Sequence, residues 1–299
     1  MIKNTDLSYI AGYIDGDRCF YIGKRKRKNT ISPTLQTNII IVSVNPKVLE
    51  WIQSLFEGSI SSRKQGPEKH KRLYNYVLRK TRAIPFVNMI IHFLVEKRQE
   101  AAIFIKYATM CNPKENNFYI NEMKKLKKSS NLVYKELKEE LEPYKNTVIP
   151  SDEDFAYLAG FIDAECCLSI QKDLPKGKPN HTYKTCLTCS NTKAPIFKWL
   201  LQRFGGFIFF VKRNKPGSNQ RDQFMWRISG ATLAKILPKI YQFLKHKKPV
   251  CRELMNLSAT ILPNGGDRQS ESFKSRYAQI LAKREEIVTK IHILNSKGT

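Results

Sequence analysis

Apolar and polar residues follow two different periodicities along this chain, and together they predict helices and strands. The stretch "LSYIAGYIDG" (7–16) is apolar and rich in small residues, which favours a buried helix. The runs "CFYIGKRKR" and "LQTNIIIV" read as two strands joined by a polar loop. A helix around Trp51, two more strands ("GSISSRK" and "LYNYVLRK") and further helical segments follow. This order is typical of an α/β domain with antiparallel hairpins.

The same order of elements occurs a second time. The segment "FAYLAGFIDAECCLSI" (155–170) matches "LSYIAGYIDGDRCFYI" (7–22), so that Asp17 corresponds to Glu165 at an offset of 165 − 17 = 148. Trp51 corresponds to Trp199 at the same offset, and "FLVEK" matches "FLKHK" at an offset of 150. We therefore predict a duplicated domain with repeats over 1–111 and 155–299, joined by a charged, partly helical linker over 112–154.

The first helix of each repeat carries small residues on one face. Gly12 and Gly16 are four residues apart, and Gly160 and Ala164 take the same places in the second repeat. Small residues at this spacing let two helices approach closely, so the repeats are predicted to pair about a pseudo-twofold axis. Asp17 and Glu165 would then meet at one end, although acids at a helix C-terminus are unfavourable by about 0.3–1 kcal/mol each.

The charge of the chain points to a polyanionic partner. Lys and Arg number 52 against 26 Asp and Glu, a net charge of +26, which favours nucleic acid over the alternative of lysines that serve solubility alone. No run of about 18 apolar residues predicts a membrane span, and the N-terminus lacks the features of a secretory signal. The seven cysteines are therefore expected to be free thiols, and the lone "CLTC" (186–189) is not expected to bind zinc.

A bound cation would make two neighbouring acids favourable. The carboxylates of Asp17 and Glu165, with the last-turn carbonyls of Gly16 and Ala164, are hard oxygen ligands suited to Mg²⁺. The alternative is that both acids are solvated ends of ordinary core helices. A magnesium site beside a basic sheet suggests phosphodiester hydrolysis. Lys97 and Lys247 would then either stabilise charge that develops on the phosphate or only anchor it, and the sequence leaves both roles open.

The segments "IAGYIDGDR" and "LAGFIDAEC" resemble the LAGLIDADG signature of intron-encoded homing endonucleases, in the single-chain form with two copies. The resemblance implies tandem αββαββα repeats whose two antiparallel four-stranded sheets form a DNA-binding saddle. It implies that Asp17 and Glu165 are the metal-binding catalytic acids and that Lys97 and Lys247 are the basic catalytic residues. It also implies Mg²⁺-dependent cleavage of both strands of a long, asymmetric duplex with 3′ overhangs. Mn²⁺ is expected to substitute, and Ca²⁺ to bind without supporting cleavage.

Further expectations come from the same resemblance. They are a monomeric protein, a role in intron homing, and an intracellular location in a chloroplast or mitochondrion. This chain departs from the signature by placing Arg18 and Cys166 where glycine is usual, and by placing Glu165 where aspartate is usual. A polar residue near the end of the second strand organises water in the family. Ser43 and Asn191 are the candidates here, with Ser190 as a competitor for the latter.

Strand alternation predicts which side chains face DNA. Arg, Asn and Gln read base edges in the major groove, and the two repeats carry different sets, so the target should not be a palindrome. The predicted DNA-binding residues are Arg18, Tyr21, Arg25, Arg27, Gln36, Asn38, Ser61, Arg63, Asn75, Ser169, Gln171, Lys184, Arg213, Gln223 and Arg227. Gln36 and Asn38 are expected to correspond to Lys184 and Cys186, and Asn75 to Gln223 or Arg227.

Two other functions fit the same scaffold. An RNA-splicing maturase would take intron RNA as its partner, and a non-cleaving protein would bind a DNA sequence only. Both motif acids are intact in this chain, which favours the endonuclease without excluding a dual role.

Overall fold

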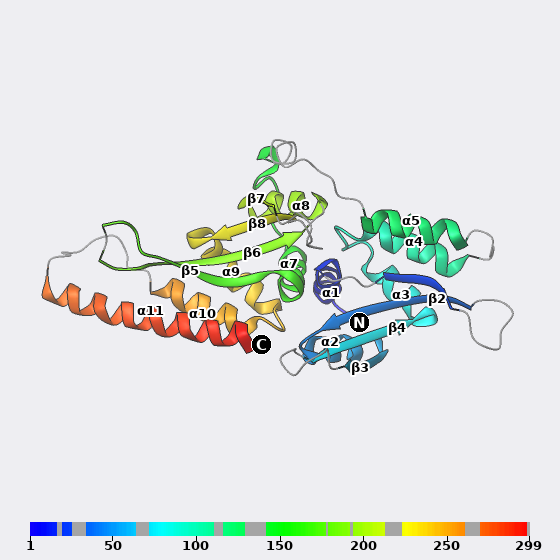
Figure 1. Ribbon diagram of the computed structural model, residues 1–299, viewed down its shortest axis with the longest axis horizontal. Helices are drawn as coiled ribbons and strands as arrows, with labels where there is room; N and C mark the ends of the chain where they lie inside the picture. Colours follow the sequence, from blue (N-terminus) through cyan, green and yellow to red (C-terminus); the bar gives the residue numbers. More distant parts are fainter. Residues whose placement is uncertain are drawn as a thin grey trace.

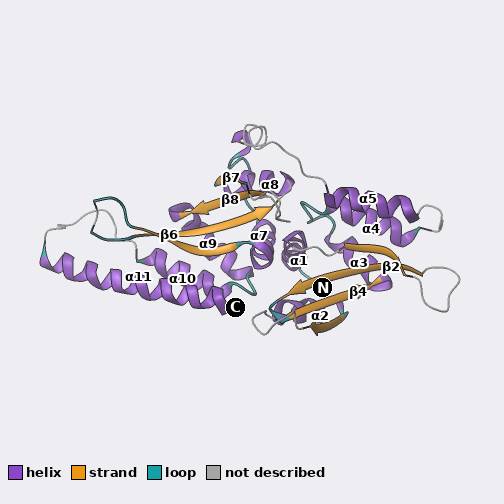
Figure 2. Cartoon of the chain, viewed as in Figure 1, coloured by secondary structure: helices purple, strands orange, loops and turns teal. Residues whose placement is uncertain are grey.

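The computed structural model shows two similar halves on either side of a central helix pair (Figures 1 and 2). It describes residues 1–16, 20–25, 34–63, 72–110, 116–128, 142–177, 179–191, 194–212, 223–260 and 270–297. Within these residues, no helix has the length and apolar character needed to cross a bilayer.

The first half contains four strands and the helices that cover them. Its elements are α1 (Asn4–Gly16), β1 (Phe20–Arg25), β2 (Thr34–Ser43), α2 (Pro46–Phe56), β3 (Ser59–Arg63), β4 (Leu73–Arg79), α3 (Lys80–Ile90), α4 (Arg98–Thr109) and α5 (Asn116–Lys128). The strands form an antiparallel sheet in the order β1-β2-β4-β3. Helix α5 lies in the segment assigned to the linker and packs on α4 and β1.

The second half repeats this arrangement. Its elements are η2 (Glu142–Tyr144), α7 (Asp152–Glu165), β5 (Cys167–Asp173), β6 (Thr182–Asn191), α8 (Ala194–Phe204), β7 (Phe207–Val211), β8 (Gln223–Ser229), α9 (Gly230–Phe243), α10 (Lys248–Ala259) and α11 (Glu271–Lys297). The antiparallel sheet has the equivalent order β5-β6-β8-β7. The predicted fold class, two four-stranded antiparallel sheets in a two-repeat saddle, is confirmed.

Each sheet buries one face against its own helices. In the first sheet Ile39, Ile41, Tyr76 and Leu78 are fully buried, and they alternate with more exposed neighbours along β2 and β4. The second sheet buries Leu187, Trp226 and Ile228 in the same way. Alternation along a strand places the remaining side chains on the opposite face, so each sheet keeps one face free of its own helices.

Helices α1 and α7 lie side by side at the centre of the molecule (Figure 1). A Cβ atom added at Gly12 would lie 2.0 Å from the Tyr157 carbonyl oxygen, and one added at Gly160 would lie 1.9 Å from the Tyr9 carbonyl oxygen. No real side chain fits at such distances, so glycine is required by the close approach of the two backbones. The predicted pairing of the repeats through these glycines is confirmed.

A reciprocal pair of aspartates ties the two halves together. Asp15 accepts hydrogen bonds from the backbone N–H groups of residues 95–97 at 2.8–3.0 Å and from the Tyr157 hydroxyl at 2.6 Å. Asp163 accepts from the backbone N–H groups of residues 245–247 at 2.7–2.9 Å and from the Tyr9 hydroxyl at 2.6 Å. Burial, with the neighbouring carboxylate second, raises the pKa of each tyrosine well above its usual value. Each repeat therefore supplies a hydroxyl that the other repeat's aspartate needs.

Helix α7 begins with a capping box formed by Ser151 and Asp154. The Asp154 backbone N–H donates to the Ser151 hydroxyl at 3.2 Å, and the Ser151 backbone N–H donates to the Asp154 carboxylate at 3.0 Å. This capping box satisfies two backbone donors that a helix start leaves without partners. It fixes the N-terminal end of the helix whose other end carries Glu165.

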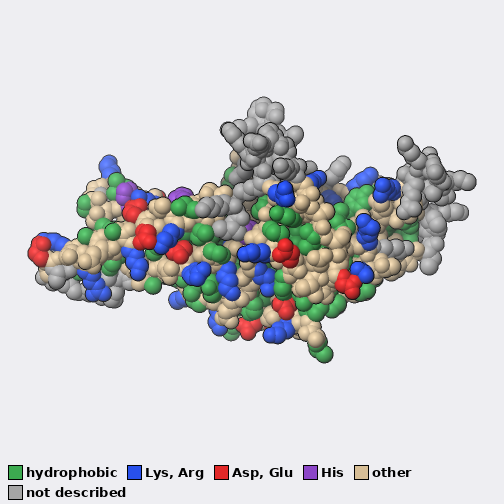
Figure 3. Space-filling model, turned by 90° about the horizontal axis from the view of Figure 1, so that it is seen from below, with side chains coloured by type: hydrophobic (Ala, Val, Ile, Leu, Met, Phe, Trp, Pro, Cys, Tyr) green, Lys and Arg blue, Asp and Glu red, His purple; other side chains and the backbone are tan. Residues whose placement is uncertain are grey.

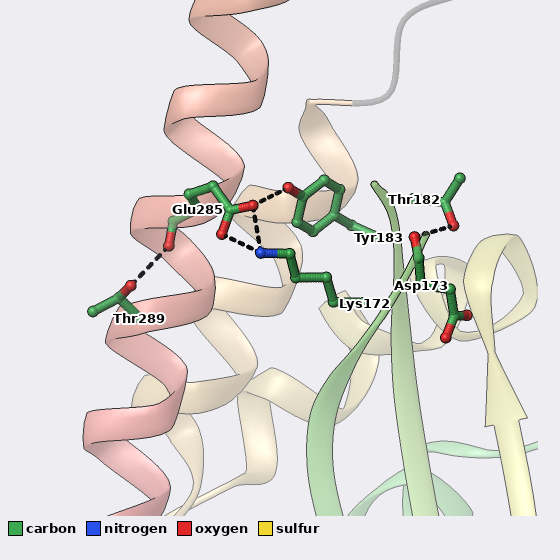
Figure 4. A network of polar contacts seen from close by, with 6 residues as sticks. All are labelled: Lys172, Asp173, Thr182, Tyr183, Glu285 and Thr289. Carbon is green, nitrogen blue, oxygen red and sulfur yellow. Dashed lines mark hydrogen bonds and ion pairs between the residues drawn. The ribbon is translucent and has the colours of Figure 1, made fainter. Parts of the chain in front are cut away.

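The long helix α11 packs against α10 and β5, on the side of the second sheet that faces its helices. Figure 4 shows Glu285 of α11 between Lys172 and Tyr183 of the β5–β6 hairpin. The Lys172 amine lies 2.7 Å from the Glu285 carboxylate, and the Tyr183 hydroxyl donates to the same group. These two hydrogen bonds lower the pKa of Glu285. The network holds the far end of the hairpin against the helix.

One expectation about the cysteines is wrong. Cys166 and Cys189 are joined by a disulfide that links the residue after Glu165 to strand β6. Cys167, Cys186 and Cys251 are free thiols, as expected. Sequence spacing could not reveal the pair, because strand β6 returns beside the end of α7 only in the folded chain. The disulfide also uses Cys189 of "CLTC", in agreement with the expectation that this segment does not bind zinc.

Candidate active site and nucleic-acid interface

Glu165 lies at the C-terminal end of α7, in a hollow between the two repeats. The hollow has a volume of about 380 Å³. The first repeat lines it with Tyr13, Val42, Ser43, Val44 and Leu73, and the second with Asp163, Ala164, Glu165, His246 and Lys247. The candidate acid of one repeat therefore shares its surroundings with side chains of the other, including Ser43.

The other candidate acid, Asp17, lies outside the described residues, as does Arg18. The described part of α1 ends at Gly16, where an added Cβ would lie 2.4 Å from the Ala164 Cβ and 3.1 Å from the Glu165 Cγ. The C-terminal ends of the two motif helices are thus in contact. The predicted juxtaposition is seen for Gly16, Ala164 and Glu165, and for Asp17 it stays a prediction.

The two lysines hold the ends of these helices. The Lys97 amine donates to the Ile14 carbonyl at 2.6 Å, and the Lys247 amine donates to the Ile162 and Cys166 carbonyls at 2.6 Å each. Burial lowers the pKa of Lys247. An ammonium group at a helix C-terminus satisfies unpaired carbonyls and opposes the negative end of the helix dipole. The two lysines therefore offset the negative charge that the helix ends and the nearby acids create together.

The donor groups at the helix ends are of the kind that Mg²⁺ prefers. Glu165 supplies a carboxylate beside the last-turn carbonyl of Ala164, and oxygen atoms are hard ligands. Asp163 is not a further ligand, since backbone N–H groups and Tyr9 occupy its oxygens. Across the described ranges, no group of three or more His, Cys, Asp or Glu side chains is arranged to hold a metal. The donor chemistry fits Mg²⁺, and a second carboxylate would have to come from Asp17.

Strand register gathers the predicted DNA-facing residues of the first repeat on one face. Tyr21 pairs with Asn38 and Gly23 with Gln36, across β1 and β2. Ser61 pairs with Asn75 across β3 and β4. Because paired residues point to the same side, these side chains share the face that the helices leave uncovered. Arg25 and Arg63 lie on the same face, and Arg27 lies outside the described residues.

The second repeat presents a corresponding face. Ser169 pairs with Cys186 and Gln171 with Lys184, which matches the expected correspondence with the first repeat. The Arg227 guanidinium donates to the Gln171 side chain and, at 3.0 Å, to the Cys186 sulfur. Arg227 and Gln223 also alternate onto this face. Arg213 lies outside the described residues.

The expected counterpart of Asn75 is wrong. Ser61 pairs with Asn75 in the first repeat, and the equivalent Phe209 pairs with Met225 in the second. Met225 therefore occupies the place of Asn75, and Gln223 and Arg227 lie two residues to either side. The alignment failed because the repeats differ by two residues in length between β3 and the final strand, and apolar Met225 gave no polar match.

Sequence reasoning missed two residues near the helix ends, Glu96 and His246. The Asn191 side chain donates to the Glu96 carboxylate across the repeat boundary, and His246, which takes the place of Glu96, lines the hollow. Ser190, by contrast, pairs with Met225 and faces the open side of the sheet. Glu96 and His246 could have been found as the residues before Lys97 and Lys247. Their closeness to the other repeat could not.

Basic side chains outnumber acidic ones on the face of the molecule shown in Figure 3. Over the whole chain, Lys and Arg number 52 against 26 Asp and Glu. This excess of positive charge favours a polyanionic partner.

Comparison with known proteins supports this geometry. Residues 10–112 match the sequence model of a family described as LAGLIDADG endonuclease. No curated protein matches the chain in sequence.

The structure resembles solved meganucleases along most of its length. I-SmaMI bound to cleaved DNA has 15% identity and a TM-score of 0.63, with 96% of this chain and 95% of that chain covered. I-SmaMI bound to uncleaved target in the presence of calcium ions has 16% identity and a TM-score of 0.63, with 96% and 97% covered. The LAGLIDADG meganuclease I-CpaMI bound to uncleaved DNA has 15% identity and a TM-score of 0.58, with 92% and 98% covered. Residues 10–112 thus carry the sequence signature of the LAGLIDADG endonuclease family, and the chain as a whole has the two-repeat fold of its single-chain meganucleases.

Proposed function

We propose that this protein is a sequence-specific DNA endonuclease that cleaves both strands of a long, asymmetric duplex. The observation that carries the proposal is the contact between the ends of the two motif helices, at Gly16, Ala164 and Glu165, between two sheets that each keep a helix-free face. The solved relatives with the same fold are bound to DNA, one of them to cleaved DNA.

The sheets would bind the duplex and set its register. Arg, Asn, Gln and Lys side chains on the open faces suit the base edges and phosphates of a major groove. The two faces carry different residues at equivalent positions, such as Asn38 in the first repeat and Cys186 in the second, so a non-palindromic target is expected. Specificity would come from these strands, and the helix ends would meet the phosphodiester.

The helix ends would carry out hydrolysis with Mg²⁺ held by Asp17 and Glu165, assisted by the carbonyls of Gly16 and Ala164. Bound Mg²⁺ would supply Lewis-acid stabilisation and an activated water. Lys97 and Lys247 would keep the two helix ends in place and lower the repulsion between neighbouring acids. Ser43 and Asn191 lie near these ends and would position water. Mn²⁺ is expected to replace Mg²⁺, and Ca²⁺ to permit binding without cleavage.

The proposal includes 3′ overhangs, a monomeric enzyme, a role in intron homing and an organellar location, all of which the family resemblance suggests. An RNA-splicing maturase or a non-cleaving DNA-binding protein is the alternative. Either would retain binding without a need for the two acids.

The test is cleavage of a randomised duplex library in Mg²⁺, followed by sequencing of the cut ends. Ca²⁺ and the variant Asp17→Asn/Glu165→Gln serve as controls. A single asymmetric site with staggered, Mg²⁺-dependent cuts supports the proposal. Persistent duplex binding by folded protein, with no cutting in Mg²⁺ or Mn²⁺, would contradict it and would direct the next assay to RNA.

A further inference from the structure

The edge strand of the second sheet carries apolar side chains on the open face, where the first sheet is polar. Phe207, Phe209 and Val211 alternate outward along β7, and they take the places of Ser59, Ser61 and Arg63 in β3. Met225 of β8 adjoins Phe209 on the same face. The open face of the second repeat therefore ends in an apolar corner, defined by Phe207, Phe209, Val211 and Met225.

The apolar corner is exposed although its side chains are large. Phe207 is 62% exposed and Phe209 is 43% exposed, whereas Ile208 between them is buried. Covering such a ring with a partner would be favourable, because it removes apolar surface from water. Two such rings on one face indicate a surface that a partner covers.

The surroundings of the apolar corner favour a nucleic acid over a protein. Phe207 pairs with Arg227, whose guanidinium contacts Gln171 on the same face. The Lys145 amine lies 4.3 Å from the centre of the Phe207 ring. The corner thus continues the polar, basic face that the proposed function assigns to DNA, and its positive rim is complementary to phosphate.

Only one standard base offers a methyl group in the major groove. Thymine presents its C5-methyl there, whereas adenine, guanine and cytosine carry no methyl group. A phenylalanine can contact this methyl group, and it forms no hydrogen bond to the other bases.

We propose that Phe207 and Phe209 select thymines in the half-site bound by the second repeat, by packing on their methyl groups. This inference rests on the proposed function and adds a specificity rule to it. The first repeat has Ser59 and Ser61 in the same places, so its half-site should show no such dependence at the equivalent positions.

The experiment removes methyl groups without changing base pairing. Once the target is known, each thymine of the second half-site is replaced in turn by deoxyuridine, and equilibrium binding is measured without Mg²⁺. The wild type is compared with Phe207→Ser/Phe209→Ser, which installs the residues of the first repeat. Phe118→Ser is the matched control, since Phe118 is 61% exposed but lies on α5, away from the open faces.

We expect wild-type affinity to fall roughly fourfold for each contacted methyl group, given about 0.8 kcal/mol per buried CH₂-sized group. The Phe207→Ser/Phe209→Ser variant should lose this sensitivity at the same positions and keep its melting temperature, while Phe118→Ser should behave as wild type. Equal wild-type affinity for thymine and deoxyuridine at every position, or a half-site without thymine, would overturn the inference and leave the endonuclease standing. Absence of any duplex binding would contradict the proposed function itself.

Discussion

The two halves of this protein share a frame but differ on the surfaces that would meet a substrate. The frame is repeated closely: Tyr9 and Tyr157 donate to the opposite aspartate, and Lys97 and Lys247 donate to carbonyls at the ends of α1 and α7. The open faces differ at most paired positions, from Asn38 and Cys186 to Ser61 and Phe209. Duplication therefore preserved what joins the halves, and the chemistry that would read a target diverged.

The helix ends differ in a way that bears on the proposed DNA cleavage. The first repeat has Asp17 followed by Arg18, and the second has Glu165 followed by the disulfide-bonded Cys166. Glutamate is longer by one methylene group, and the disulfide ties the next residue to β6. The second helix end is thus restrained by a covalent link that the first cannot have, since Ile41 takes the place of Cys189.

The largest expected effect comes from breaking the helix pair that joins the halves. Gly12→Leu would place side-chain atoms where the Tyr157 carbonyl lies, and we expect a loss of about 3 kcal/mol or more in the free energy of unfolding. Gly160→Leu should cost a similar amount, because its contact with Tyr9 is equivalent. Thermal unfolding measures both. Gly177→Ala is the control, since no atom lies within 4 Å of its added Cβ and only its positive φ is strained. A wild-type melting temperature for Gly12→Leu would refute the packing argument.

The next effect tests whether the two acids are equivalent. We expect Asp17→Asn and Glu165→Gln each to reduce DNA cleavage by on the order of 10²–10³-fold while duplex binding is retained, because an amide supplies no charge for a metal. Strand-specific nicking assays would show which cut each acid serves. Normal cleavage by Glu165→Gln would remove this residue from the active site.

Loss of the disulfide should have an effect of intermediate size on stability, and it should act on the second half alone. Closing a loop of 23 residues is expected to stabilise the fold by about 3 kcal/mol. A thiol reductant should therefore lower the melting temperature of the wild type and leave that of Cys166→Ala/Cys189→Ala unchanged. Mass spectrometry after thiol alkylation would confirm the pairing. Full alkylation of Cys166 and Cys189 in the unreduced, unfolded protein would contradict it.

The smallest expected effect tests whether the two sides of the helix pair are equally stabilising. Tyr9→Phe and Tyr157→Phe each remove one hydrogen bond to a buried carboxylate, for an expected cost of about 1.5–3 kcal/mol. The two costs should be similar, since each hydroxyl donates to the opposite aspartate at 2.6 Å, and urea unfolding midpoints would compare them. Clearly unequal costs would show that the two sides of the helix pair are not interchangeable.

The sequence alone determined the repeats, the helix pair and the candidate acids. Strand alternation also placed Tyr21, Gln36 and Asn38 on one face, because a period of two leaves little freedom once a core face is chosen. These features depend on residues that are near in sequence or related by a constant offset between the repeats. Both relations can be recognised from the repeated sequence pattern.

Only the tertiary structure decided which distant groups meet. The contact of Asn191 with Glu96 and the place of Ser43 beside Glu165 depend on how one repeat packs on the other. The Cys166–Cys189 disulfide depends on how β6 packs beside the end of α7 within the second repeat. The equivalence of Met225 with Asn75 could be recognised only from the hydrogen-bonded register of β7 and β8, since a change of two residues in loop length shifts a sequence alignment. Long-range packing and strand register are properties of the folded chain, because they depend on contacts between segments that no local pattern encodes.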